Sequence, residues 1–474
     1  MAFAEYEKYD GLGLAELVKQ KKISALELVD EAIARAERHN SKLNAIIFKA
    51  FDAARDAAKK NVANGAFSGV PMLLKDMRAG AVGMPTRSGS RMVPPVPADH
   101  DSTLVSRYRE AGLIPLGKTN VPEFGILPVS ESKLYGPARN PWNTNHTPGG
   151  SSGGSAASVA AGIVPLAHAT DGGGSIRIPA ACCGLVGLKV SRGRITQGPD
   201  ASDSTSGLSV DNCVTRSVRD TAAMLDLSCA PDYGDPYFAP APQGSYLEGI
   251  KTAPKRLKIA VSYKNYQGQP FHPDVEAAVR KAVKICEDLG HITEEARPQV
   301  NTEENTMAFM TLWATATGYG VETLARMTGQ TPSLDNLEGL TLSLYEQGKS
   351  VPAIQQIWAQ QTMYRMARVM AKQHETYDAW LTPTLARPPL AIGTINVDER
   401  DIRTAFAPII DYVPFTATQN ATGQPAINLP LHWNADNLPI GVQFVARNGN
   451  EMLLLQLAAQ IEQAAPWFDK RPQL

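Results

Sequence analysis

Hydrophobic residues follow helical spacing in some parts of the chain and form short continuous runs in others. Near the N-terminus, Ser24 is followed three residues later by Glu27, and Ile23 and Leu28 flank the pair. A serine and a glutamate at this distance form a capping box, and the two apolar residues form a hydrophobic staple, so a helix is predicted to begin here. Residues 1–60 are predicted to be helical.

Apolar runs typical of buried strands come next. Residues 70–74, with the sequence Val-Pro-Met-Leu-Leu, form such a run and lead directly to Lys75. A helix is predicted from about Ser102 to Gly112, and another apolar strand follows at residues 113–116. Helices that alternate with short apolar strands indicate an α/β fold.

The second half of the chain continues this alternation after a proline-rich segment. Residues 231–254 are predicted to be a surface excursion, because regular alternation resumes directly after them. A helix is then predicted from Asp274 to Gly290, with an apolar stripe along one side. Further strands are predicted at residues 257–261, 379–381, 426–431 and 439–445, and further helices at about 302–327, 352–374 and 450–463.

Composition and charge narrow the class of protein. The chain has 474 residues, of which 43% are hydrophobic, and Lys plus Arg (46) nearly balance Asp plus Glu (47). This mixture excludes collagen-like, coiled-coil and disordered proteins. A net charge of −1 produces no field that would attract nucleic acid or an anionic membrane, so neither is expected as a partner.

The sequence also predicts where the protein is located. Glu5 precedes any apolar run, so no secretory signal is expected, and the longest charge-free stretch (140–170) is interrupted by proline, glycine and asparagine. The five cysteines form no CxxC pair and have no histidine at ligand spacing, so free thiols and no metal centre are expected. Free thiols favour a reducing compartment, and a cytoplasmic protein is predicted.

Three segments concentrate residues suited to catalysis. Lys75 follows an apolar strand that should carry its amine inward, and a desolvated amine has a lowered pKa and can act as a base near neutral pH. Residues 149–155, Gly-Gly-Ser-Ser-Gly-Gly-Ser, precede a run of small residues with helical character. Residues 171–177, Asp-Gly-Gly-Gly-Ser-Ile-Arg, place consecutive glycine amides ahead of Ser175, as an oxyanion beside a nucleophile requires.

Each segment also has a purely structural interpretation. Most lysines are solvated, serine–glycine runs are often flexible, and a glycine triplet can simply make a tight turn. Residues 149–153 match the GxSxG pattern of α/β-hydrolases, but a loop precedes them where that motif needs a strand. Residues 130–133 match S-x-x-K without its companion motifs. Both of these matches are interpreted as coincidental.

Taken together, the motifs resemble those of the amidase signature family, bacterial amidases in particular. The resemblance rests on Lys75-Asp76 and on residues 149–155, 170–179, 184–189, 422–426 and 438–443. It covers nearly the whole chain and implies one α/β domain over residues 1–474, in which a twisted mixed sheet is covered by helices on both faces. It also implies a catalytic core at about residues 70–200 and substrate-channel helices at about 300–375.

The resemblance implies a role for each motif. Ser175 is expected to be the nucleophile, Ser151 a bridging serine after a cis Gly150–Ser151 peptide bond, and Lys75 the base. The separation of the two serines matches the family's separation, which favours Ser151 over its neighbour.

The backbone amides around the nucleophile are expected to form an oxyanion hole. The donors would be the amides of Gly172, Gly173, Gly174 and Ser175. Gly172 departs from the family pattern, which usually has isoleucine or threonine there, and is expected to loosen the hole without removing a donor. The residues that flank the loop, Asp171 and Arg177, are expected to form a structural ion pair.

These features predict a serine hydrolase that cleaves carboxylic amides through an acyl-enzyme, with no cofactor. The substrate would be a small-molecule amide, with esters and carbamates also open. Trp313 and Phe415 are predicted to line its pocket, although a core position is an equally good interpretation. The chain is expected to be a monomer or homodimer. The alternatives are an amidotransferase A-type subunit, which would need partner chains, and a non-catalytic binding protein on the same scaffold.

Overall fold

The computed structural model describes residues 3, 5–60, 62–203 and 205–474. Within these residues, most strands join one mixed sheet, which has 11 strands in the order β1-β3-β2-β6-β8-β7-β12-β13-β11-β9-β10, and β4 and β5 form a separate pair. The strands are β1 (Ile46–Lys49), β2 (Pro71–Lys75), β3 (Ile114–Thr119), β4 (Glu131–Ser132), β5 (Gly136–Pro137), β6 (Leu166–Asp171), β7 (Val186–Lys189), β8 (Val210–Thr215), β9 (Lys258–Val261), β10 (Ile292–Glu295), β11 (Ala379–Pro383), β12 (Ala426–Trp433) and β13 (Pro439–Ala446).

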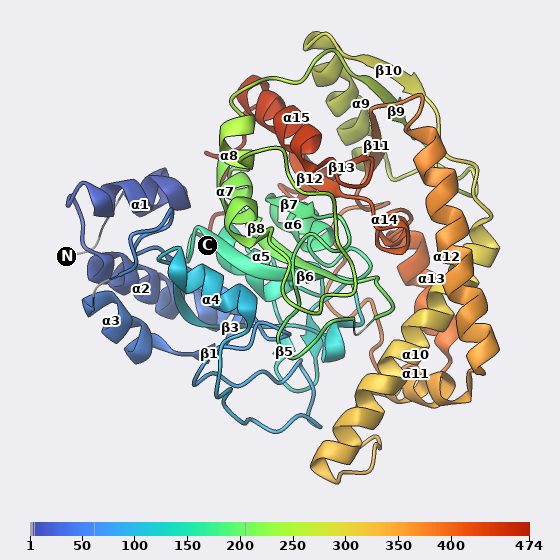
Figure 1. Ribbon diagram of the computed structural model, residues 1–474, viewed down its shortest axis with the longest axis horizontal. Coiled ribbons are helices and arrows are strands. Elements are labelled where there is room, and N and C mark those ends of the chain that lie inside the picture. Colours follow the sequence, from blue (N-terminus) through green and yellow to red (C-terminus); the bar gives the residue numbers. More distant parts are fainter. Residues whose placement is uncertain (1–2, 4, 61, 204) are drawn as a thin grey trace.

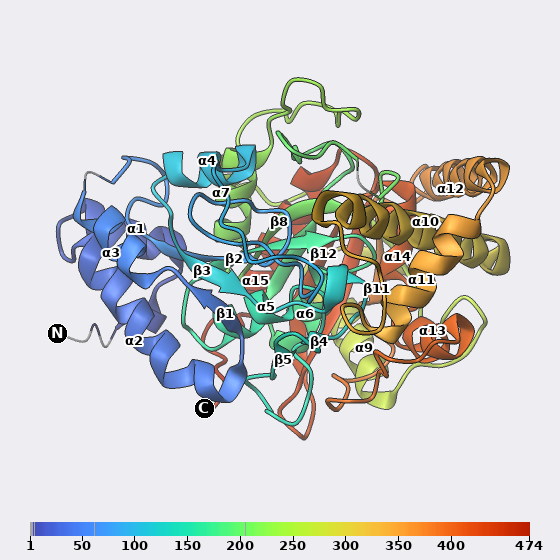
Figure 2. The same cartoon turned by 90° about the horizontal axis from the view of Figure 1, so that it is seen from below.

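Helices cover both faces of this sheet. In Figure 2, α4 and α7 lie on one side of the strands and α5 and α6 on the other. The α-helices are α1 (Gly11–Lys19), α2 (Ala25–Leu43), α3 (Phe51–Lys59), α4 (Thr103–Glu110), α5 (Gly153–Ala160), α6 (Arg177–Cys183), α7 (Val218–Ser228), α8 (Tyr246–Gly249), α9 (Pro273–Asp288), α10 (Thr302–Thr328), α11 (Gly339–Ser350), α12 (Ala353–Gln373), α13 (Ile402–Tyr412), α14 (Thr416–Thr422) and α15 (Glu451–Ala464). Short 3-10 helices are formed by Tyr6–Lys8 and Glu123–Gly125. The predicted α/β fold with a mixed central sheet is confirmed.

The N-terminal segment agrees with its prediction except at one strand. Ser24 accepts a hydrogen bond from the Glu27 amide, and Glu27 returns one to the Ser24 amide, so the capping box starts α2 as expected. Residues 46–49, however, form β1, an antiparallel strand at the edge of the sheet next to β3. The prediction of helix throughout residues 1–60 is wrong here, because pairing with a distant strand overrides local preference.

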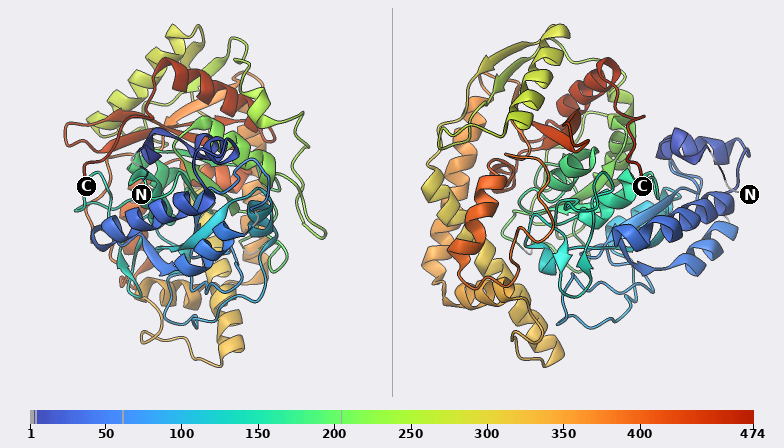
Figure 3. Two further views of the ribbon diagram at one scale, coloured as in Figure 1. Left: turned by 90° about the vertical axis from the view of Figure 1, so that its left-hand side faces the viewer. Right: turned by 180° about the vertical axis from the view of Figure 1, so that it is seen from behind.

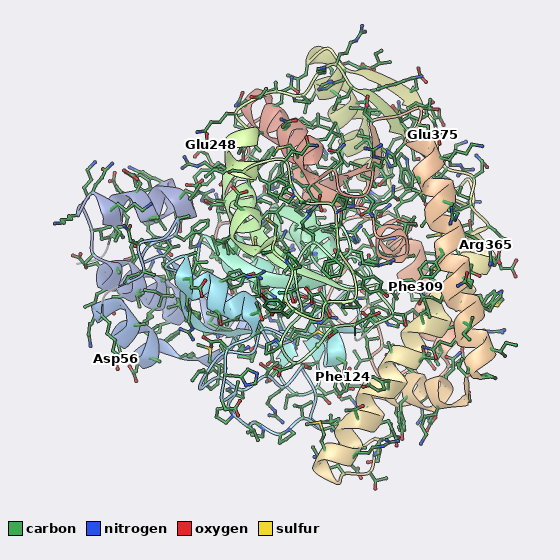
Figure 4. The ribbon with its side chains drawn as sticks, viewed as in Figure 1. Asp56, Phe124, Glu248, Phe309, Arg365 and Glu375 are labelled. Atoms are coloured by element: carbon green, nitrogen blue, oxygen red, sulfur yellow. The ribbon has the colours of Figure 1, made fainter. Side chains whose placement is uncertain are left out.

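A second group of helices stands at the opposite end of the molecule. The helices between residues 302 and 412 lie far from the N-terminal helices (Figures 1 and 3). Two of them, α10 and α12, follow the predicted ranges closely, whereas α11 between them was not predicted. In Figure 4, Phe309 lies on the side of α10 nearer the strands, while Arg365 of α12 lies on the outer side of the molecule. The helices found between residues 3 and 474, outside the few undescribed positions, are too short or too polar to cross a membrane.

The sheet topology brings Lys75 and the start of segment 171–177 to one edge. Strand β2 ends at Lys75 and strand β6 ends at Asp171, and the two strands are parallel neighbours with Leu73 paired to Ala167. Their carboxyl ends therefore lie side by side. In open α/β sheets, this edge is where ligands usually bind.

Candidate active site

Lys75 is buried beneath two hydroxyl groups. Its Nζ lies 2.7 Å from the Oγ of Ser151 and 2.7 Å from the Oγ1 of Thr170. The Lys75 side chain has no exposed surface. Neutral hydroxyl groups stabilise the protonated, charged form of a lysine amine much less than a carboxylate partner does.

The environment of Lys75 changes its protonation. Burial lowers the pKa of Lys75 from 10.5 to about 7, and the guanidinium of Arg78 lowers it further, while Asp211 and Asp171 oppose the shift. A substantial fraction of Lys75 is therefore neutral near pH 7 and can accept a proton. The sequence predicted this property from the apolar strand alone.

Ser151 follows a cis peptide bond. The Gly150–Ser151 bond is cis, as the family resemblance implied. Ser151 is 2% exposed and lies just before α5, in the loop that follows Pro148. No strand leads into this loop, so the match of residues 149–153 to the GxSxG motif, which must follow a strand, is coincidental.

The loop that carries Ser175 is held by a buried ion pair. Arg177 donates from Nε to Oδ2 of Asp171 at 3.0 Å and from Nη2 to Oδ1 at 2.9 Å, and both side chains are fully buried. Burial would raise the pKa of Asp171, but Arg177 outweighs it and holds that pKa at about 2. The same carboxylate accepts hydrogen bonds from the amides of Gly174 at 2.8 Å and Ile176 at 3.2 Å. The expected ion pair is present and determines the shape of the loop around Ser175.

This arrangement changes the predicted set of oxyanion donors. Because the Gly174 amide donates to Asp171, it is already engaged and cannot also serve a ligand. Within the described part of the chain, the amides of Gly172, Gly173 and Ser175 donate no hydrogen bond. The interpretation of Gly174 as a fourth donor is therefore corrected, and three amides remain as candidates.

Helix α14 supports the loop from the other side. Thr416 donates from Oγ1 to the carbonyl of Gly173 at 2.5 Å. Asn420 donates to both the carbonyl and the carboxylate of Asp171 at 2.8 Å. The sequence analysis missed both residues. No local signal marks them, because each lies more than two hundred residues from its partner along the chain.

Ser175 opens into a cavity. It is 7% exposed and lines a space of about 1160 Å³ that includes its opening to solvent. Lys75 is hydrogen-bonded to Ser151. Among the described residues, however, no hydrogen bond joins Ser151 to the hydroxyl of Ser175. The Ser175 hydroxyl is thus left available to a ligand in the cavity.

The cavity walls are mainly apolar and come from α10, α12, α13 and α14. Trp313 is part of this wall, as predicted, and it stacks on Phe309 with ring centroids 5.4 Å apart. Of the described residues that line the cavity, Asp411 is the only charged one. Lining residues with apolar or aromatic side chains include Ile126, Leu127, Met310, Met363, Met366, Phe406 and Ile409. Such a cavity suits an uncharged ligand.

Phe415 does not line the cavity, contrary to prediction. It is fully buried and contacts the edges of Tyr266 and Trp380, with ring centroids 5.1 Å and 5.5 Å away. Tyr266 lies between Phe415 and the cavity and supplies the lining at this point. An apolar ring in a loop can face either the core or a pocket, and here the core interpretation is correct.

The described residues contain no group of three or more His, Cys, Asp or Glu side chains arranged to hold a metal ion. The five cysteines are all free thiols. Burial raises the pKa of Cys182 to about 12, so this thiol is protonated and unreactive near neutral pH.

Comparison with known proteins defines the class. The family model for amidases matches residues 27–455. The chain is 36% identical to a 6-aminohexanoate-cyclic-dimer hydrolase of Paenarthrobacter ureafaciens, over 98% of this chain and 96% of that protein. It is 38% identical to the putative amidase AmiC of Mycobacterium bovis, over 97% and 95% of the two chains. The solved structure of a 6-aminohexanoate cyclic dimer hydrolase complexed with substrate superposes with a TM-score of 0.95, at 35% identity over 98% of this chain and 99% of the other.

The fold and these similarities define an enzyme that hydrolyses amide C–N bonds. The chain belongs to the amidase family.

Proposed function

We propose that this amidase works through an acyl-enzyme formed on Ser175, with Ser151 and Lys75 as a proton relay. One observation carries the proposal. A fully buried lysine, whose pKa is lowered to about 7, contacts Ser151, and Ser175 opens into an apolar cavity. A nucleophilic serine needs a base of this kind within reach, either directly or through one intermediary.

In the first half of the reaction, Ser175 Oγ attacks the carbonyl carbon of the substrate. Its proton passes to Ser151 Oγ, whose own proton passes to neutral Lys75 Nζ. The relay then returns a proton to the leaving nitrogen, the C–N bond breaks and the amine departs. This step needs Ser175 to come within hydrogen-bond reach of Ser151, and contacts of this type often tighten only when substrate is bound.

In the second half, water attacks the ester carbonyl of the acyl-enzyme. Lys75 again receives the proton through Ser151, and the relay returns it to Ser175 as the acid is released. In both halves the amides of Gly172, Gly173 and Ser175 are the candidate donors to the oxyanion. Losing one such donor commonly costs about 10²–10³-fold in rate.

The cavity favours uncharged substrates. Its walls carry many apolar and aromatic side chains and a single charged one, Asp411. Two of the similar proteins described above are 6-aminohexanoate cyclic dimer hydrolases. Cyclic and linear amides with apolar chains are therefore the proposed substrates. Esters and carbamates, which pass through the same tetrahedral chemistry, are proposed as secondary substrates.

The proposal is tested by a substrate panel and a covalent probe. The purified chain should hydrolyse at least one member of a panel of 6-aminohexanoate oligomers, anilides, p-nitrophenyl esters and aryl carbamates, and a fluorophosphonate should label Ser175. Hydrolysis without labelling would contradict the acyl-enzyme. Absence of both would favour a binding protein, and activity that appears only with added partner chains would favour an amidotransferase subunit.

A further inference from the structure

A tryptophan ring lies against the backbone of the nucleophile loop at Gly172. A Cβ atom added at Gly172 would lie 3.3 Å from both Cη2 and Cζ3 of Trp313 and 2.7 Å from Oγ of Ser209. The 3.3 Å distance to the Trp313 ring is shorter than most contacts that real Cβ atoms make. The ring therefore already occupies the space that a side chain at position 172 would need. The Ser209 hydroxyl can rotate away, whereas the Trp313 ring, which stacks on Phe309, would have to shift by a few tenths of an ångström.

The Trp313 ring is held in place by its neighbour on the helix. Phe309, one turn earlier on α10, stacks on it with an interplanar angle of 20° and ring centroids 5.4 Å apart. A Cβ atom added at Gly173 would lie 3.5 Å from Cζ of Phe309. Two stacked rings thus rest on two consecutive glycines, and residues one turn apart on a helix are placed to do this together.

These glycines also carry two of the candidate oxyanion donors. Gly173, Ser175 and Trp313 line the same cavity, so an acyl group bound at these amides lies in the part of the cavity that the Trp313 ring bounds. The ring therefore limits the width of whatever is attached to the carbonyl carbon. A methylene chain fits beside a flat ring, whereas a branched carbon needs the space that the ring already fills.

We propose that Gly172 and Trp313 form a matched pair that selects substrates with an unbranched carbon next to the scissile carbonyl. The inference rests on the proposed function and adds to it the substrate class, namely linear acyl chains. Trp313 is a specificity-determining residue in this proposal. Gly172 acts through it, because the missing side chain is what lets the ring approach.

The first experiment compares an unbranched with a branched acyl group. Hexanoyl and pivaloyl p-nitroanilides are assayed with the wild type, Trp313→Ala and Gly320→Ala. Gly320 lies on the same helix and has open space around its Cβ position, so its variant should behave as the wild type. Trp313→Ala should shift the kcat/KM ratio toward the pivaloyl substrate by about tenfold or more. An unchanged ratio would overturn the proposal.

The second experiment tests the pairing itself. Gly172→Ala alone should lower kcat/KM for the hexanoyl substrate by about 100-fold, because displacing the ring also displaces the loop. The double variant Gly172→Ala, Trp313→Ala should recover at least part of that loss, since the ring no longer competes for space. If Gly172→Ala is as active as the wild type, or if the double variant is worse than both single variants, the pair is not matched.

A third measurement separates this inference from the acyl-enzyme proposal. Binding of hexanamide and pivalamide, measured by calorimetry on the same variants with Ser175→Ala added so that the amides are not hydrolysed, should show the same change in preference. Circular dichroism and thermal melting show whether each variant is folded. Failure of the fluorophosphonate to label Ser175 would contradict the nucleophile, while an unchanged binding preference in Trp313→Ala would contradict the pair.

Discussion

Asp171 and Arg177 form a two-pronged ion pair in the interior, with both side chains fully buried. The carboxylate also accepts a hydrogen bond from the amide of Gly174, so one group orients both the guanidinium and the backbone just before Ser175. The pair lies outside the proposed proton relay. Its role is to hold Ser175 and the free amides in a fixed arrangement.

Replacing Asp171 by Asn should therefore destabilise the protein strongly. The change leaves Arg177 buried without its counter-charge, and breaking a buried ion pair from one side typically costs about 3–5 kcal/mol. Chemical denaturation measures the loss. Asp288→Asn, which removes an exposed partner of Lys284, is the matched control and should change the free energy of unfolding by no more than about 0.5 kcal/mol. Equal effects of the two substitutions would contradict the structural role of the pair.

Ser175→Ala should abolish turnover without unfolding the chain. The acyl-enzyme cannot form without the hydroxyl, and a fall in kcat of at least about 10³-fold is expected. Steady-state kinetics and fluorophosphonate labelling provide the measurements. The control is Ser350→Ala, at an exposed position at the end of α11, which should keep both activity and labelling. Retained labelling in Ser175→Ala would assign the nucleophile to another residue.

Activity should rise with pH as Lys75 loses its proton. Its pKa is lowered to about 7 by burial and Arg78, so kcat/KM should increase through this region and level off above it. Lys75→Met should lower kcat/KM by at least about 10²-fold and remove this rising limb. A rising limb that persists unchanged in Lys75→Met would mean that another group provides the base.

Glu338 should make the stability of the protein fall as pH increases. Burial and the neighbouring Glu123 carboxylate raise the pKa of Glu338 from 4.5 to about 8. The folded state therefore holds a proton that the unfolded state releases. The stabilisation is complete below pH 4.5 and is lost as pH rises toward about 8.

Glu338→Gln tests this dependence, because it keeps a neutral side chain at all pH values. Its melting temperature relative to the wild type should increase between pH 5 and pH 9. The Gln side chain also retains an oxygen to accept the Lys133 amide, as Glu338 does. A constant difference across this range would show that Glu338 titrates normally in the folded protein.

Some site residues could be predicted from sequence and others could not. Lys75 was predicted to be buried because the apolar residues before it form a continuous strand, and this is what the fold shows. Trp313 and Phe415 were both expected to line the pocket, yet one lines the cavity and the other lies in the core. Which way a ring faces depends on which helix packs beside it, and no local pattern contains that information.

By itself, the sequence determined the local features: the capping box that starts α2, the alternation of helices and strands, and the glycine-rich segments around Ser151 and Ser175. These depend on residues close together in the chain. Only the tertiary structure decided that Asp171 engages the Gly174 amide, that β1 is a strand, and that Trp313 rests on Gly172. The physical reason is that strand pairing and ring packing join segments far apart in the sequence, and that even the contact between Asp171 and Gly174 depends on a loop held by the distant helix α14.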